Sequence, residues 1–239
     1  AELVPRLRTA LSGQGVSLDD TILVREGRYR SFSCSDTPCC PPDGVPVPES
    51  SALVAAVVAE GTVIRADRDD LAAEVAEPEE AAAARARVVS ALLESTAAHG
   101  SVGIEDDDMR RLLEQTCEDA AVGALRMDDA VRLTLLLRIG DLRDIAYAHM
   151  LTVGAQPHRM LWTAVCRQVP RDMAAAPLAL AALSAYLSGA GALATEAIAR
   201  AVAVDPRHAT VRLVEDLMAA AITPGVVREA LACSVLHDG

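Results

Sequence analysis

Residues 178–206 read LALAALSAYLSGAGALATEAIARAVAVDP, and this stretch decides the fold class. Its leucines and alanines are strong helix formers, so we expect one helix on each side of Gly189. Gly189 opens the turn between the two helices. Ala194 and Ala201 are small enough to let the second helix approach the first closely, and Asp205-Pro206 ends it. The stretch therefore predicts a pair of packed helices.

This pair resembles a tetratricopeptide repeat. The spacing that carries the resemblance, within about residues 175–206, is that of Leu178, Gly189, Ala194, Ile198, Ala201 and Pro206. Alanine and glycine occupy the positions where the repeat has bulky aromatic side chains. We find no second clean copy of the pattern, so the resemblance covers a single helix pair.

The composition of the 239 residues favours close-packed helices. Hydrophobic residues make up 51% of the chain but aromatic residues only 2%, so alanine, leucine and valine must build the core. The net charge of −12, with arginines spread along the chain, argues against nucleic acid as a partner. No apolar run reaches the roughly 18 residues of a membrane span, so we expect no membrane partner and a cytoplasmic location. The absence of lysine excludes Schiff-base chemistry and a P-loop.

The chain divides into two predicted parts, residues 1–49 and 50–239. The first holds a short helix over 2–12, a hairpin turning at Glu26-Gly27, and a loop rich in cysteine and proline. The second part is helical, with its longest helix over about 79–98, and we expect little strand outside 20–34 except for a short piece near 62–64. Further helices are predicted near 106–120, 128–138, 141–152, 157–168, 172–188, 191–203, 207–221 and 224–234. The fold class is therefore mainly α.

Residues 24–50, VREGRYRSFSCSDTPCCPPDGVPVPES, are the most distinctive segment of the sequence. They resemble the actinobacterial family known as domain of unknown function 4192. The residues that carry this resemblance are Tyr29, Phe32, Cys34, Cys39-Cys40-Pro41-Pro42, Gly44 and Pro48. Family members are longer and begin with a further α/β segment. The resemblance therefore implies that only the later part is present and that residues 1–49 end an α/β domain; it implies no activity.

Cys34, Cys39 and Cys40 place three sulfurs within seven residues. Three interpretations stay open: a metal or redox site, for which zinc is the candidate ion; a Cys34–Cys39 disulfide; or buried thiols that anchor the loop. In the last case Phe32 and the thiols would dock on a helix near 51–60, beside Leu53, Val54 and Val57. Three further cysteines lie on predicted helices and are expected in the core: Cys117, Cys166 and Cys233.

Other candidate motifs have structural explanations. GAGALA, residues 189–194, has the GxGxxA form of a dinucleotide-binding loop, but a helix precedes it where a strand is required. Acidic residues 105–108 suit a helix start without a metal.

His149 and His158 could share a pocket near Trp162, although surface histidines are the simpler expectation. Arg25, Arg28 and Arg30 are expected to protect a strand edge rather than bind an acidic partner.

The leading functional hypothesis is a non-catalytic protein-binding or scaffolding module, because helical arrays present surfaces and the sequence contains no catalytic motif. On this hypothesis the partner is another protein or a second copy of the chain, and no cofactor is needed. The alternative is a metal-binding or redox protein, or an enzyme, that holds zinc at Cys34, Cys39 and Cys40.

Overall fold

The computed structural model describes residues 3–15, 17–48, 52, 55–56, 65, 67–76, 82–99 and 104–235, without the side chains of 95–99 and 231–235. The chain forms two compact units, residues 1–64 and 65–239. The predicted boundary at 49/50 stays a prediction, because residues 49–51 lie outside the described ones. The strand predicted near 62–64 lies outside them too.

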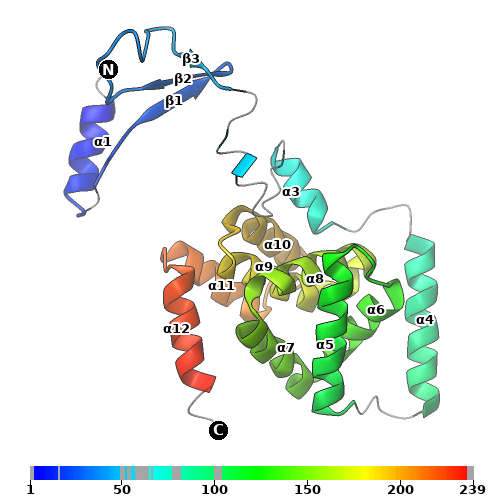
Figure 1. Cartoon of the computed structure of the whole chain (residues 1–239). Helices are drawn as coiled ribbons and strands as arrows, with labels where there is room; N and C mark the ends of the chain where they lie inside the picture. The colour runs from blue at the N-terminus through cyan, green and yellow to red at the C-terminus, as the bar shows by residue number, and fades with distance from the viewer. Residues whose placement is uncertain are drawn as a thin grey trace. The chain divides into compact units, whose positions relative to one another are not determined.

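The elements with described bounds in unit 1 are helix α1 and a small antiparallel sheet (Figure 1). Helix α1 spans Leu3–Ser12, β1 spans Ile22–Arg25 and β2 spans Arg28–Ser31, which confirms the predicted helix and hairpin. Glu26 and Gly27 have φ of 52° and 70°, the left-handed pair that a two-residue hairpin turn requires. The register pairs Val24 with Tyr29 and Arg25 with Arg28.

A third strand, β3, spans Val45–Pro46 inside the cysteine- and proline-rich loop and pairs with β2. The sequence predicted little strand outside 20–34 and did not place this two-residue strand. Pro46 is tolerated because the sheet order β1-β2-β3 places β3 at an edge. Gly44 precedes it with φ of 75°, and a Cβ there would lie 2.9 Å from the Tyr29 carbonyl oxygen. Glycine therefore lets the loop return close to β2.

Every described element of unit 2 is a helix, which confirms the mainly α fold. Its helices are α3 (Arg68–Glu74), α4 (Ala82–His99), α5 (Asp106–Ala121), α6 (Met127–Leu136), α7 (Gly140–Val153), α8 (Ala155–Gln168), a 3-10 turn η2 (Arg171–Met173), α9 (Ala175–Leu187), α10 (Gly191–Val204), α11 (Ala209–Ala219) and α12 (Pro224–Val235). The predicted helices from residue 106 onward match these bounds within a few residues.

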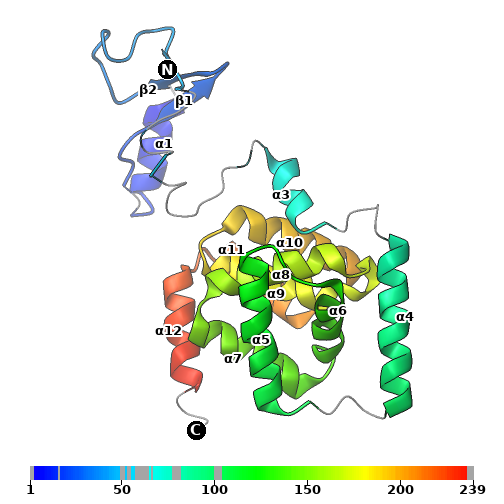
Figure 2. The same ribbon diagram turned by 45° about the vertical axis from the view of Figure 1, so that its right-hand side comes forward.

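Helix α9 is the centre of unit 2. Every residue from Pro177 to Leu187 is buried, as expected for a helix that is apolar on all sides. It packs against α8, α10, α11 and α12, and Figures 1 and 2 show it enclosed by the first three of these helices. Tyr186 donates a hydrogen bond of 2.5 Å to the Ile222 carbonyl, and Arg228 donates one of 2.9 Å to the Leu187 carbonyl.

Helices α9 and α10 form a hairpin joined by Ser188, Gly189 and Ala190. Gly189 has φ of 81°, and the Ala190 N–H donates to the Ala185 carbonyl at 2.8 Å. The predicted helix–helix turn is therefore confirmed, and helix α9, not a strand, directly precedes the GAGALA motif. Ala194 and Ala201 are fully buried on α10, as the sequence predicted.

His149 and His158 lie in the core, so the expectation of surface histidines was wrong. The Trp162 indole N–H donates to His158 Nδ1 at 3.1 Å, and His158 Nε2 lies 2.8 Å from His149 Nδ1. Because His158 Nδ1 accepts, the proton of neutral His158 lies on Nε2 and is donated to His149. His149 then carries its own proton on Nε2, a buried atom without a hydrogen-bond partner among the described residues.

This histidine pair makes the stability of unit 2 depend on pH. Burial, and then repulsion from His149, lower the pKa of His158 to about 3. Burial also lowers the pKa of His149, where Glu114 opposes and Arg110 adds to the effect. In the unfolded chain these histidines take up protons as the pH falls below about 6.5, whereas the native pair stays neutral there. The contribution of the pair to the free energy of unfolding is therefore complete above pH 6.5 and falls as the pH drops.

We therefore expect His158 to lower the free energy of unfolding by about 2 kcal/mol between pH 7 and pH 5. Denaturant unfolding followed by Trp162 fluorescence measures this change. His158→Leu should remove that part of the pH dependence, since the carboxylates contribute equally in both proteins. An identical pH dependence in wild type and variant would contradict the assignment.

The close approach of α10 gives a second prediction. Ala201→Leu should lower the free energy of unfolding by about 1–3 kcal/mol, because the added atoms have no space in a packed interface. Ala192→Leu is the matched control: Ala192 is exposed on the same helix, and its substitution should change stability by less than about 0.5 kcal/mol. Equal effects in denaturant unfolding would show that α10 does not need small residues at its buried face.

Candidate metal centre

The three neighbouring cysteines lie on the loop between β2 and β3. Cys34 follows the end of β2, and the chain then turns, with the Cys40 N–H donating to the Asp36 carbonyl at 2.7 Å. A second turn joins the Gly44 N–H to the Pro41 carbonyl at 2.8 Å. The first turn brings Cys39 and Cys40 back towards Cys34, an arrangement that the spacing in the sequence does not reveal.

Two arginines of β2 hold this loop on the sheet. Arg28 donates from Nε to the Asp43 carbonyl and from Nη2 to the Gly44 carbonyl, both at 2.7 Å. Arg30 donates to the Pro42 carbonyl at 3.5 Å, and its guanidinium carbon lies 5.7 Å from the centre of the Phe32 ring. The sequence suggested edge protection for these arginines; in the structure they bind the loop backbone instead.

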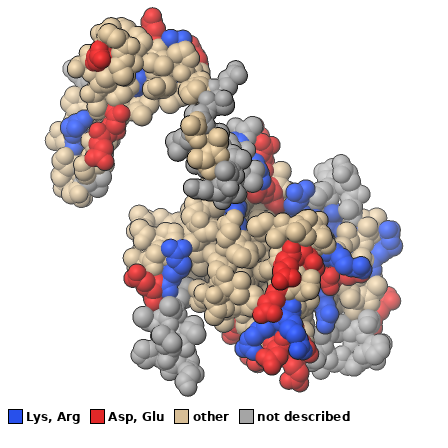
Figure 3. Space-filling model, in the orientation of Figure 1, with Lys and Arg blue, Asp and Glu red and all other residues tan. Residues whose placement is uncertain are grey.

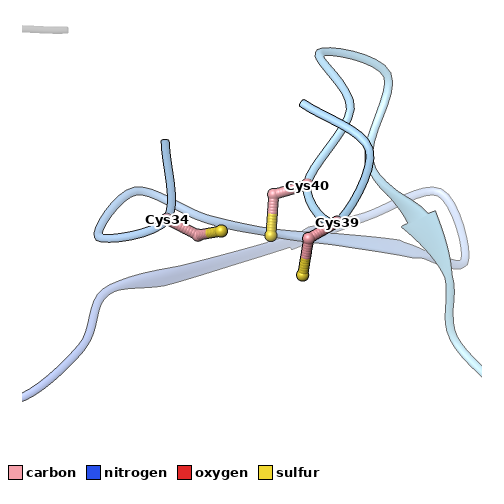
Figure 4. Close-up of side chains that lie close together, drawn as sticks. All are labelled: Cys34, Cys39 and Cys40. Carbon is pink, nitrogen blue, oxygen red and sulfur yellow. The ribbon is translucent and has the colours of Figure 1, made fainter. Parts of the chain in front are cut away.

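The three sulfur atoms converge. All lie within 4.8 Å of one another, and Figure 4 shows Cys34 extending towards the turn that carries Cys39 and Cys40. Cys39 is exposed and the other two are half-buried, and the interpretation as buried packing thiols stays a prediction. The helix near 51–60 with Leu53, Val54 and Val57, on which they were expected to dock, lies outside the described residues.

The proximity of the sulfurs governs their protonation. The pKa of the Cys39 thiol is raised to about 11, first because its proton is shared with the Cys40 and Cys34 sulfurs and second because thiolates there would repel another negative charge. Three adjacent thiolates are therefore unfavourable at neutral pH unless a cation compensates them. A bound metal ion supplies that compensation and displaces the protons.

The sulfur positions suit a metal ion. Metal–sulfur bonds of about 2.3 Å in a tetrahedral site place sulfurs roughly 3.8 Å apart, so only a small contraction of the cluster is needed. Thiolates are soft ligands that favour zinc and copper(I) over magnesium or calcium. Three ligands leave one tetrahedral position for water or another molecule. Within the described residues, no other group of three cysteine, histidine or acidic residues has this proximity.

The acidic residues at the start of α5 form ion pairs instead. Asp107 and Asp108 pair with Arg110 and Arg111 on the next turn. Figure 3 shows acidic and basic side chains interspersed on this face of the molecule. The helix-start explanation of residues 105–108 is therefore sufficient.

Two further cysteines are core residues, as predicted. Cys117 and Cys166 are buried, and burial raises both thiol pKa values, that of Cys117 to about 12 with help from Glu118. Neither has the low pKa of a nucleophilic thiol. The side chain of Cys233 lies outside the described ones.

One of three comparisons with known proteins gives a match. Within the described residues, no helix combines the length and apolarity that crossing a bilayer requires. Comparisons with curated proteins and with solved structures find no match. The model of one family, Domain of unknown function (DUF4192), matches residues 1–225. Two implications of the resemblance stay predictions: that only the later part of the family's domain is present, and that the source is actinobacterial. The match covers nearly the whole chain, which therefore belongs to the DUF4192 family.

Proposed function

We propose that unit 1 is a metal-binding module that holds one zinc ion through Cys34, Cys39 and Cys40. The observation that supports this most directly is the convergence of the three sulfurs within 4.8 Å. The arginine–carbonyl hydrogen bonds of Arg28 and Arg30 position the loop before any ion binds. The reduced thiols that the site needs agree with a cytoplasmic location, which is part of the proposal.

The weak packing of unit 1 supports a structural role for the ion. Among the described residues of unit 1, only Gly44 is buried, and α1 and β1 contain no buried residue. A chain segment of this size without a core needs another source of stability, and a metal commonly supplies it. The open fourth position also leaves room for a further ligand on the ion.

The test is metal analysis of protein purified without a histidine tag, followed by Co²⁺ titration of the metal-free protein. We expect one ion per chain and a cobalt–thiolate absorption band. Chelator should lower the melting temperature of unit 1, because an ion at roughly 100 times its Kd stabilises by about 3 kcal/mol.

Cys34→Ser, Cys39→Ser and Cys40→Ser should each abolish tight binding, and Cys34→Ala should equal Cys34→Ser. Cys117→Ala, which removes a thiol from unit 2, is the matched control and should keep one ion. Absence of stoichiometric metal, or variants that still bind it, would refute the metal site.

The second candidate is the protein-binding role predicted from the sequence, and the exposed strand β1 favours it. β1 lies at a sheet edge, and Ile22, Leu23 and Val24 are 56%, 49% and 64% exposed. Such an edge is a template for another strand. Two copies of β1 paired antiparallel across a two-fold axis would cover these apolar side chains with one another. The tetratricopeptide-like α9–α10 pair is consistent with a scaffolding role.

On this account the chain self-associates through β1, and light scattering at increasing protein concentration should detect a dimer. Leu23→Glu should shift the equilibrium to monomer, because like charges would face each other across the new strand pair. Val122→Glu, at an exposed position of unit 2, is the matched control and should leave the dimer intact. A monomer at all concentrations would exclude pairing of β1 with itself.

A further inference from the structure

Unit 2 contains a cavity of about 480 Å³ that belongs to none of the sites described above. Residues of α8, η2, α9 and α10 line it together with Val75, which directly follows α3, and all of them lie within the described part of the chain. Its apolar wall includes Val75, Cys166, Leu178 and Val204. The volume falls in the range of small-molecule sites, which typically combine an apolar wall with a few polar groups.

The charged groups of this cavity are mainly cationic. Arg171, Glu196 and Arg200 all line it. The carboxylate of Glu196 already accepts a hydrogen bond of 2.6 Å from Arg68 Nε, an ion pair that joins α3 to α10. Arg68 therefore compensates the negative charge of Glu196, and the guanidinium group of Arg200 gives the cavity a local positive charge within an acidic protein.

Arg200 is the group best placed to bind a ligand. It makes no side-chain hydrogen bond or ion pair with any described residue, although it is only partly exposed. Its positive charge acts on the buried Cys166 thiol, opposing the increase in pKa that burial causes, which places the charge beside the apolar wall. A guanidinium without a carboxylate partner next to an apolar surface suits an oxyanion attached to an apolar body.

We propose that this cavity binds a small organic anion. Its oxyanion head group, a carboxylate or a phosphate, pairs with Arg200, and its apolar part contacts Leu178 and Val75. Cys166 takes no covalent part, because the thiol is buried and its pKa is raised. The site is therefore a binding site, and it is independent of the metal module because all its residues belong to unit 2.

Isothermal titration calorimetry with the full chain tests this proposal. The main probes are hexanoate and hexyl phosphate, and a comparison of the two identifies the head group. Hexanol is the control that lacks the charge. Acetate and inorganic phosphate are the controls that lack the apolar part. We expect one site per chain with a Kd below about 1 mM for one of the two hexyl anions. Hexanol, acetate and inorganic phosphate should each bind at least about tenfold more weakly.

Two variants identify the site. Arg200→Gln should weaken the binding of the hexyl anion at least about tenfold, and Arg212→Gln, an exposed arginine of α11, is its matched control. Ala203→Phe should block the cavity from its exposed rim without a change of charge, with Ala192→Phe on the same helix as control.

Thermal unfolding followed by Trp162 fluorescence shows whether each variant is folded. If Arg200→Gln is unfolded, Ala203→Phe alone decides. No binding of either hexyl anion, or binding that a folded Arg200→Gln or Ala203→Phe protein retains, would overturn the proposal.

Discussion

The burial of α9 on every side is the constraint on which unit 2 depends. A helix without a polar face needs neighbours around its whole circumference, and α8, α10, α11 and α12 supply them. Few of these neighbours carry bulky aromatic side chains, so small residues such as Ala194 and Ala201 are needed to bring the helix axes close together. Polar groups at its end are also satisfied, because Arg228 donates to the Leu187 carbonyl.

The two units solve the problem of stability by different means. Unit 2 relies on burial of apolar surface, and even His149 and His158 are kept neutral in the core beside Trp162. Unit 1 buries almost nothing among its described residues and relies on directed polar contacts, above all the donation from Arg28 to two loop carbonyls. A metal cross-link at the cysteines would add to the same kind of stabilisation, since it too is local and directional.

Local signals in the sequence predicted most helix bounds, because caps and breakers act on neighbouring residues: Gly189 closes α9, and α10 ends at Asp205-Pro206. Features that depend on distant segments were missed. Pro46 argued against a strand at β3, and only the sheet order, which places β3 at an edge, makes a proline acceptable there. The sulfur cluster depends on the turn at Asp36–Cys40, and the cavity beside Arg200 combines five segments. The histidine pair joins two helices whose contact no periodicity encodes.

The central position of α9 has a consequence for synthesis on the ribosome. The helices α5, α6, α7 and α8 are synthesised before residues 175–187. The main packing partner of α8 is thus missing when α8 is made, and α10 must follow before α9 itself is covered. Once both have emerged, sequential neighbours can pack quickly, because contacts between adjacent helices close short loops. Until then the nascent helices expose surface that chaperones recognise.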